Sequence, residues 1–367
     1  MSNNIKEIHI HAYKGIHELR LTGLNQINIL TGKNNSGKTS ILELLATIAN
    51  PGQLSSWLNG LRVNSSPYLG YYRYNSYYEG IINLFPCNVA EKQICYDYLD
   101  EDGQNHNVQM SGRLFSDQLP ESELSKMNGF TKKGNNKETE EFIDVNGIEI
   151  VVMRDAKELC KEVIYDKQRR LPRTMRTASA REILYISPVE HEEYNKYLNA
   201  VFQNSEYYGL LIKMLKYFDE GLIGINAVKS DEDVGVVNYV VQSSVYKQSL
   251  PLSAYGDGMK KSVLLLSALL QAKDGILLID EFETGIHSSC MEQVFGLLLE
   301  NAISLNVQVF MTTHSKEALD KVIHTSSHLQ KKINLYTLYK REGQNLVRAI
   351  SSQEAVEFED ELGLELR

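Results

Sequence analysis

One short stretch, residues 31–40 with the sequence TGKNNSGKTS, constrains the fold of this chain more than any other. Within it, residues 32–39 follow the pattern G-x-x-x-x-G-K-[ST], in which the backbone N–H groups of a glycine-rich loop cradle phosphate groups. An apolar run, 27–30, precedes this phosphate loop, and a segment with helical spacing, 40–46, follows it. A strand, a glycine loop and a helix in this order predict an α/β fold with a phosphate site at the start of the helix. The alternative is an ordinary connection between a strand and a helix.

The side chains of the phosphate loop fit this chemistry. Lys38 is expected to neutralise the β- and γ-phosphates of a nucleotide, and the hydroxyl of Thr39 to hold Mg²⁺. Asn35 stands where many such loops have a glycine. Because asparagine enters the left-handed region of backbone space more readily than most residues, we expect the loop to remain intact.

Composition and charge restrict the class of protein. The 367 residues are 43% hydrophobic and 23% charged, which is typical of a soluble globular chain with a sizeable core, in one large or two ordinary domains. A net charge of −9 argues against a surface dominated by phosphate contacts but allows a local basic patch. No apolar run reaches the roughly 18 residues of a membrane span, and residues 1–4 lack the apolar core of a signal peptide. We therefore expect a cytoplasmic protein without a membrane partner.

The cysteines favour a reducing compartment. None of the four belongs to a C-x-x-C spacing, so we expect reduced thiols and neither a disulfide framework nor a zinc site. They are Cys87, Cys95, Cys160 and Cys290.

Hydrophobic patterning divides the chain into three parts. The first, 1–55, begins with a small antiparallel β meander that is expected to end in the phosphate loop. The second, 56–182, has crowded tyrosines and polar tracts, and we interpret it as an α+β insertion, partly β and partly mobile. The third, 183–367, returns to core-like strands and helices. We expect the first and third parts to form one nucleotide-binding domain.

The same patterning places the individual elements. Strands are expected at 8–12, 17–21, 27–30, 95–99, 107–113, 148–153, 183–188, 223–228, 234–245, 276–279 and 307–311. Helices are expected at 40–46, 157–165, most of 190–218, and 259–272.

A second group of functional residues follows a predicted buried strand late in the chain. The run ILLI at 276–279 predicts that strand, which delivers Asp280 and Glu281 at its C-terminal end. Asp280 is expected to help hold Mg²⁺ beside Thr39, and Glu281 to act as general base on the attacking water. The alternative is a solvated acidic turn. The catalytic interpretation is favoured because a phosphate loop needs such an acidic partner.

Two further features stand at the ends of predicted elements. Gly256 and Gly258 leave backbone N–H groups unshielded at the start of the helix at 259–272, which makes a second potential phosphate-binding site. One nucleotide needs only one phosphate loop, so this second site is expected to bind the γ-phosphate of a nucleotide held by another subunit. The alternative is a simple helix cap.

His314 follows the strand at 307–311, and at that sheet edge it is expected to contact the γ-phosphate or the catalytic water, unless it is structural.

These motifs occur in the order found in ABC-type ATPases, and the chain resembles most closely the RecF/SMC-like branch that contains the overcoming-lysogenization-defect (OLD) ATPases. The opening IHAYKGIHELRL…INILTGKNNSGKTSIL and the end SSQEAVEFEDELGLELR are similar to that family, and the resemblance covers 1–55 and 183–367. It implies an α/β fold, a P-loop NTPase of ABC ATPase type with a mixed sheet, flanking helices and an N-terminal antiparallel β subdomain, interrupted by an α+β insertion. It also implies an ATPase that uses ATP and Mg²⁺.

The resemblance also implies roles for individual residues. Contacts to the nucleotide are implied for Lys14, Gly32, Asn34, Asn35, Ser36, Gly37, Lys38, Thr39 and Ser40. The implied metal-binding residues are Thr39 and Asp280, and the implied catalytic residues are Lys38, Glu281 as general base and His314 as the switch histidine. A signature turn acting in trans is implied for Ser253, Gly256 and Gly258, and a D-loop that links two sites for 284–287. The signature here is Gly-Asp-Gly, in contrast to the transporter form Ser-Gly-Gly-Gln.

The resemblance suggests partners as well. Segment 56–182 is too short for long coiled-coil arms, and the chain ends too soon after His314 to hold the Toprim nuclease of larger OLD proteins. We therefore expect a stand-alone ATPase that forms homodimers or larger homo-oligomers with ATP at the interface. The implied role is a sensor or scaffold that controls a separate effector, a Toprim or HNH nuclease or a toxin, in bacterial anti-phage defence.

Two alternative functions differ from this role. A RecF-like ATPase that binds DNA in repair or recombination is motivated by six cations between Lys167 and Arg181, which would neutralise phosphates. The acidic net charge and the reading of this run as a solvated charged surface argue against it. A nuclease in its own right is disfavoured because no carboxylate cluster remains once Asp280 and Glu281 are assigned, and we read the acids between 357 and 365 as a solvated helix face.

Overall fold

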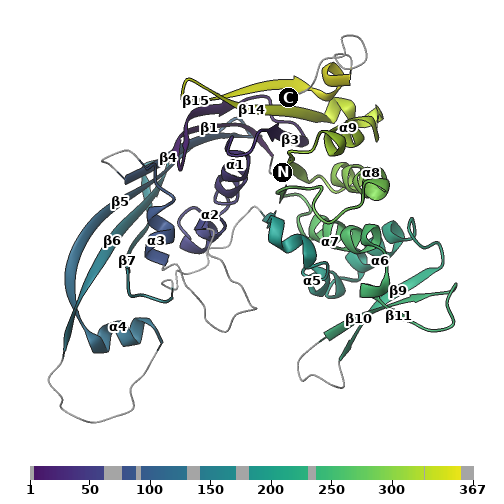
Figure 1. The fold of residues 1–367 in the computed structure, drawn as a ribbon, viewed down its shortest axis with the longest axis horizontal. Coiled ribbons are helices and arrows are strands. Elements are labelled where there is room, and N and C mark those ends of the chain that lie inside the picture. The colour runs from purple at the N-terminus through teal and green to yellow at the C-terminus, as the bar shows by residue number, and fades with distance from the viewer. Residues whose placement is uncertain are drawn as a thin grey trace.

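The computed structural model describes residues 4–61, 77–87, 92–129, 141–170, 182–229, 237–325 and 327–356. Within these ranges the strands form an antiparallel sheet of six strands, a mixed sheet of six strands and a smaller sheet of three strands (Figure 1). The predicted acidic helix face between 357 and 365 and residues 171–181 of the basic run lie outside the described residues.

The mixed sheet contains the strand that enters the phosphate loop. Its strand order is β15-β14-β3-β13-β12-β8, in which β15 is antiparallel to β14 and all the other pairs are parallel. The strands are β3 (Ile27–Gly32), β8 (Ile183–Ile186), β12 (Ile276–Ile279), β13 (Gln308–Thr312), β14 (Ile333–Arg341) and β15 (Gln344–Ser351).

Both faces of the mixed sheet are covered. In β12, Leu277 and Ile279 belong to one hydrophobic core with residues of three helices, and Ile276 and Leu278 belong to a second core with residues of α1. Since a strand buried on both faces needs an apolar residue at every position, this arrangement explains the ILLI run. The helices are α1 (Lys38–Leu45) on one face and α7 (Asp257–Gln271), α8 (Ser288–Ser304) and α9 (Lys316–Thr325) on the other.

The antiparallel sheet packs against the side of α1 that faces away from the mixed sheet. Ile5, Ile8 and Ile10 share the second core with Ile41 and Leu45 of α1, so this helix is enclosed between two sheets. The strand order is β2-β1-β4-β5-β6-β7, and β5 and β6 extend from the body of the molecule towards α4 (Figure 1). The elements are β1 (Ile5–Tyr13), β2 (Ile16–Leu21), β4 (Lys92–Asp100), β5 (Asn105–Pro120), α4 (Glu121–Met127), β6 (Phe142–Arg154) and β7 (Lys157–Tyr165).

Shorter elements complete the two sides of the molecule. Beside α1 lie η1 (Leu54–Trp57), α2 (Leu58–Leu61) and α3 (Tyr77–Ile82). Around α7 lie η2 (Pro188–Glu192), α5 (Leu198–Phe202), α6 (Ser205–Leu215), β9 (Leu222–Lys229), β10 (Val237–Ser243), β11 (Leu250–Pro251) and η3 (Leu252–Ala254), and η4 (Ser327–Lys332) precedes β14. Among the described residues, no helix is long and apolar enough to cross a membrane.

The structure confirms most of the predicted elements and corrects two predictions. Residues 157–165, predicted as a helix, form the edge strand β7. Cys160 and Ile164 are buried with the spacing of one helical turn, but the same spacing fits one face of a strand. Asp155 and Ala156, with φ of 52° and 62°, turn the chain from β6 into β7, as tight hairpins with left-handed residues do. The second correction concerns β3, which pairs with β13 and β14 and does not join the N-terminal meander.

Candidate functional site

The phosphate loop adopts the backbone that its glycines permit. Gly32 ends β3 with φ of 133°, and a Cβ there would stand 2.2 Å from the carbonyl oxygen of Leu338. Gly37 has φ of 105° and precedes the first residue of α1. Asn35 has φ of 62°, so the left-handed conformation expected of it is confirmed. The N-terminus of α1 therefore opens onto the loop, where its free N–H groups attract anions.

The ammonium group of Lys38 lies over the loop. Its Nζ atom donates hydrogen bonds to the carbonyl oxygens of Gly32, at 2.7 Å, and Lys33, at 3.0 Å. Burial lowers the pKa of Lys38, and the negative charges of Asp280 and Glu281 act in the opposite direction. The phosphate loop thus holds a cation at the position where a phosphate chain would approach the start of α1.

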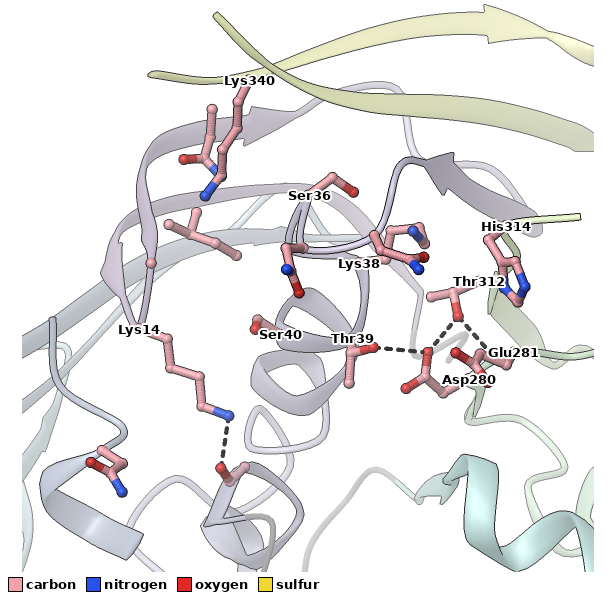
Figure 2. A pocket seen from close by; sticks show the side chains of 18 of the residues that line it. Lys14, Ser36, Lys38, Thr39, Ser40, Asp280, Glu281, Thr312, His314 and Lys340 are labelled. Carbon is pink, nitrogen blue, oxygen red and sulfur yellow. Dashed lines mark hydrogen bonds between the residues drawn. The ribbon is translucent and has the colours of Figure 1, made fainter. Parts of the chain in front are cut away.

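Asp280 is held by hydroxyl groups from three different elements, of which Figure 2 shows Thr39 and Thr312. Thr39 of α1 donates to its Oδ1 atom at 3.2 Å, and Thr312 of β13 donates to the same oxygen. Tyr185 of β8 donates to Oδ2 at 3.3 Å. Because the carboxylate is buried and stands next to the Thr39 hydroxyl, these two oxygen groups fit a hard divalent cation such as Mg²⁺.

Glu281 occupies a backbone conformation that is rare for its residue type. Its φ is 49°, and its N–H group donates to Thr312 Oγ1 at 2.8 Å, so the same threonine positions both acidic residues. Left-handed non-glycine residues cost energy and cluster at functional sites. Nearby, Nδ1 of the half-exposed His314 lies 3.4 Å from an oxygen of Glu283, which also accepts a hydrogen bond from Thr313.

These groups face one cavity of about 650 Å³, a size that suits a nucleotide. Its lining includes residues of the phosphate loop together with Lys14, Asp280, Glu281 and His314. The cavity wall also contains Asn345 and Ser36. Asn345 Nδ2 and Ser36 Oγ are both buried, and neither has a hydrogen-bond partner among the described residues. Buried polar atoms without partners are rare, and here they stand where a polar ligand would satisfy them.

Lys14 enters the cavity from the turn between β1 and β2. It has φ of 51°, and its ammonium group donates to Glu43 at 2.6 Å and to the carbonyl oxygen of Gly60 at 2.7 Å. The side chain is therefore anchored between α1 and α2 at the edge of the cavity.

The predicted signature turn lies elsewhere. Ser253, Gly256 and Gly258 are absent from the described lining of the cavity. Ser253 and Gly256 are exposed, and Gly258 is buried against Cys290, whose Cβ would stand 3.2 Å from a Cβ at position 258. The structure thus brings together the phosphate loop, the acidic pair, His314 and Lys14 within one chain. Of the predicted signature turn it leaves Ser253 and Gly256 on the surface beside the start of α7, whereas Gly258 is buried.

Sequence reasoning missed several residues of the site. Tyr185 and Thr312 hold Asp280, and Lys340 and Asn345 reach the cavity from the hairpin of β14 and β15. Thr312 directly follows the predicted strand at 307–311, so its position offered a signal. The other three lie on β8, β14 and β15, whose positions in the mixed sheet are not visible in local patterns.

A buried lysine and histidine connect α7 to the acidic pair. The ammonium of Lys261 contacts Nδ1 of His191 and donates to the carbonyl oxygen of Thr284 at 2.7 Å. His191 donates from Nε2 to the carbonyl oxygen of Asp280 at 2.6 Å, which leaves Nδ1 as the acceptor for the lysine. Burial lowers the pKa of Lys261 to about 7, and burial together with the lysine charge lowers the pKa of His191 to about 4.

Comparison with known proteins agrees with this geometry. The family described as "AAA domain, putative AbiEii toxin, Type IV TA system" matches residues 166–320. The "ATP/GTP phosphatase" of Helicobacter pylori is 25% identical over 358 residues, covering 87% of this chain and 88% of that protein. "Uncharacterized protein MJECL11" of Methanocaldococcus jannaschii is 35% identical over 114 residues, covering 30% of this chain and 98% of that protein.

A solved structure supports the fold. The SMC head bound to the C-terminal winged-helix domain of ScpA superimposes with a TM-score of 0.50 at 10% identity, covering 96% of this chain and 99% of that chain. This similarity confirms the predicted fold class, an α/β fold of the ABC ATPase-head type with an antiparallel N-terminal sheet. Together with the matched family, it shows that the chain carries a P-loop ATPase domain of AAA/ABC type.

Proposed function

The chain belongs to the protein family that includes Uncharacterized protein MJECL11 of Methanocaldococcus jannaschii, and we propose that it is a Mg²⁺-dependent ATPase whose ATP sites are shared between copies of the chain. The observation that carries this proposal is the contact between Thr39 at the start of α1 and Asp280 at the end of β12. It joins the phosphate loop to the acidic pair at the carboxyl ends of parallel strands, the edge at which α/β sheets bind ligands.

Different residues of the cavity have different roles in ATP hydrolysis. Lys38 and the N–H groups of the phosphate loop hold the phosphate chain by charge and hydrogen bonds. Thr39 and Asp280 are the residues that would hold Mg²⁺, which when bound neutralises charge on the phosphates. Glu281 accepts a proton from the attacking water, and His314 lines the same cavity within reach of the γ-phosphate region.

Sharing of the site between copies is supported by the exposed signature turn. Ser253 and Gly256 are exposed at the N-terminus of the long helix α7, away from the cavity of their own chain. A helix N-terminus offers free N–H groups to an anion. We therefore propose that this turn contacts the γ-phosphate of ATP held by a second copy, so that the homodimer is the smallest active unit.

The domain division supports a catalytic body with an attached arm. Every strand of the mixed sheet comes from 1–55 or 183–367, which favours these two segments as the ATPase domain. Segment 56–182, the proposed insertion, contributes β4 to β7 to the antiparallel sheet and, through β5 and β6, the arm that carries α4 (Figure 1). Such an arm offers a surface for a second protein without blocking the cavity.

The wider role follows from the resemblance to OLD-type ATPases. We propose that nucleotide-driven association of the chain controls a separate effector, a Toprim or HNH nuclease or a toxin, in bacterial anti-phage defence. The matched family is described as a toxin–antitoxin system, which fits an ATPase paired with a toxic partner. Purification of the chain from its native operon tests this role: a stoichiometric effector is expected, and a chain that is solitary with and without ATP contradicts it.

The DNA-binding alternative has less support. Within the described part of the basic run, Lys167 donates to the carbonyl oxygen of Asp144, and the guanidinium of Arg170 lies against Gly129. These cations therefore contact the tip of the arm. Stimulation of ATP hydrolysis by double-stranded DNA, with a steep dependence on salt, would favour the alternative.

The variant Glu281→Gln tests the ATPase proposal directly. ATP binding should remain, and the rate of phosphate release should fall by about 10²–10⁴-fold because a general base is lost. Light scattering should show ATP-trapped dimers. The matched control is Glu292→Gln, which changes an exposed carboxylate on α8 and should hydrolyse ATP like the parent. Hydrolysis at the parental rate in Glu281→Gln would contradict the assignment.

A further inference from the structure

The antiparallel sheet carries a group of metal-binding side chain types that plays no part in the proposed ATP site. His9 and His11 of β1 alternate with the buried residues Ile8 and Ile10, so both histidines point to the face of the sheet opposite the core. Glu18 of β2 lies beside them, and the ligand atoms of the three side chains all lie within 4.8 Å of one another. Within the part of the chain that the structure describes, this is the one group of three such residues.

The distances in this histidine cluster, His9, His11 and Glu18, match a coordination sphere. The two oxygens of Glu18 face one histidine each, at 3.0 Å from Nε2 of His9 and 3.5 Å from Nδ1 of His11. Four ligands placed tetrahedrally at zinc bond lengths of about 2.0–2.1 Å stand about 3.3 Å from one another. The observed pair of distances lies on either side of that value. Glu18 has φ of 47°, a left-handed conformation that is uncommon for a non-glycine residue.

A second carboxylate orients His11. Asp97 of β4 lies 2.7 Å from Nε2 of His11, and the side-chain amide of Asn107 holds Asp97 at 2.6 Å. With Nε2 directed at Asp97, Nδ1 is the ring atom of His11 that faces the Glu18 oxygen. An outer carboxylate on a ligating histidine is the usual arrangement around protein-bound zinc.

We propose that His9, His11 and Glu18 form a binding site for a divalent transition metal, with Zn²⁺ as the best chemical match and water completing the sphere. Imidazole and carboxylate ligands suit this ion, and an incomplete protein sphere is typical of exchangeable sites. The metal joins β1 to β2. Since the turn between these strands carries Lys14 into the nucleotide cavity, metal binding stabilises the hairpin from which Lys14 projects.

The test uses the untagged full chain, stripped with a chelator that is then removed, without nucleotide. Zn²⁺ binding is measured by calorimetry, and Co²⁺ binding by its visible absorption bands, which report ligand type and geometry. One equivalent should bind. His11→Ala should weaken binding by at least about 100-fold, and Asp97→Asn, which alters only the outer carboxylate, by about 10–100-fold.

Control variants distinguish loss of the metal site from loss of folding and from changes in the ATP cavity. His17→Ala removes an exposed histidine from the same hairpin and should bind Zn²⁺ like the parent. Lys38→Ala should also bind Zn²⁺ normally, so a failed ATPase proposal leaves this result unaffected. His11→Gln keeps the side-chain size if the alanine variant does not fold. The proposal is overturned if stripped protein shows no Co²⁺ bands and no Zn²⁺ heat, or if the double variant of His9 and His11 still binds one equivalent.

Discussion

Thr312→Val is the most informative perturbation of the proposed site, because one hydroxyl positions both acidic residues. Thr312 Oγ1 donates to the Asp280 carboxylate and accepts from the N–H of Glu281, and the side chain is fully buried, so water cannot replace it. A lost hydrogen bond to a charged group costs about 1.5–3 kcal/mol, and an unsatisfied buried N–H about 1–3 kcal/mol. Since Asp280 keeps its hydrogen bond from Thr39, we expect the free energy of unfolding to fall by about 3 kcal/mol, near the lower end of the sum of these two costs.

The catalytic effect of Thr312→Val should exceed its effect on nucleotide affinity. Misplacement of a catalytic group by about 1 Å costs about 100-fold in rate, so kcat should fall by about 10–100-fold while Kd for ATP changes little. Urea denaturation measures the stability, and phosphate release at saturating ATP and Mg²⁺ measures kcat.

Thr313→Val is the matched control for this prediction. Thr313 is also buried, and its hydroxyl donates to Glu283 and accepts from the N–H of Ser315, so the variant removes two comparable hydrogen bonds. A similar loss of stability with a smaller loss of kcat is expected. If Thr312→Val loses stability but hydrolyses ATP at the parental rate, the positioning of Asp280 and Glu281 does not depend on this hydroxyl, and the reasoning is refuted.

The other predictions concern binding, assembly and pH. Lys38→Ala should abolish nucleotide binding, since the cation over the loop is lost, and equilibrium binding with a fluorescent ATP analogue measures it; normal affinity would contradict the assignment of the phosphate loop. Activity per protomer should fall on dilution into the monomeric range, and full activity of a monomer shown by light scattering would argue against shared sites. Burial lowers the pKa of Lys261 from 10.5 to about 7, so between these pH values the unfolded chain binds a proton that the folded chain does not. The parent should therefore gain stability as pH rises through this range, while Lys261→Met should lack this gain in chemical denaturation at pH 7 and about 10.

Local chemistry explains what could be predicted from the sequence. The phosphate loop is recognisable because its function depends on backbone conformation, and few residue types tolerate the conformations seen at Gly32, Asn35 and Gly37. The strand before Asp280 is recognisable because burial on both faces leaves a continuous apolar run. In both places a physical requirement acts on neighbouring residues, so a short pattern records it.

Features that depend on distant pairing could not be predicted in this way. β3 pairs with β13 and β14, which come from the far end of the chain, so its separation from the N-terminal meander leaves no local trace. The helix predicted at 157–165 is wrong because β7 shows no clear alternation: Glu162 lies on the same face of the strand as the buried Cys160 and Ile164. Asn345 reaches the cavity only because β15 folds back on β14. Its contribution to the site is a consequence of tertiary structure alone.

The buried contacts of Lys261 bear on how the proposed shared site would control hydrolysis. The signature turn overlaps the first residues of α7, which begins at Asp257. Lys261 lies one helical turn after that start, in contact with His191 and with the carbonyl oxygen of Thr284. His191 in turn donates to the backbone of Asp280. A buried polar group that loses its hydrogen-bond partners is costly, so α7 cannot shift away from these acceptors without either breaking the contacts or carrying the acidic pair with it. An event at the surface turn of one chain is thus tied, through two side chains, to the position of that chain's own Asp280.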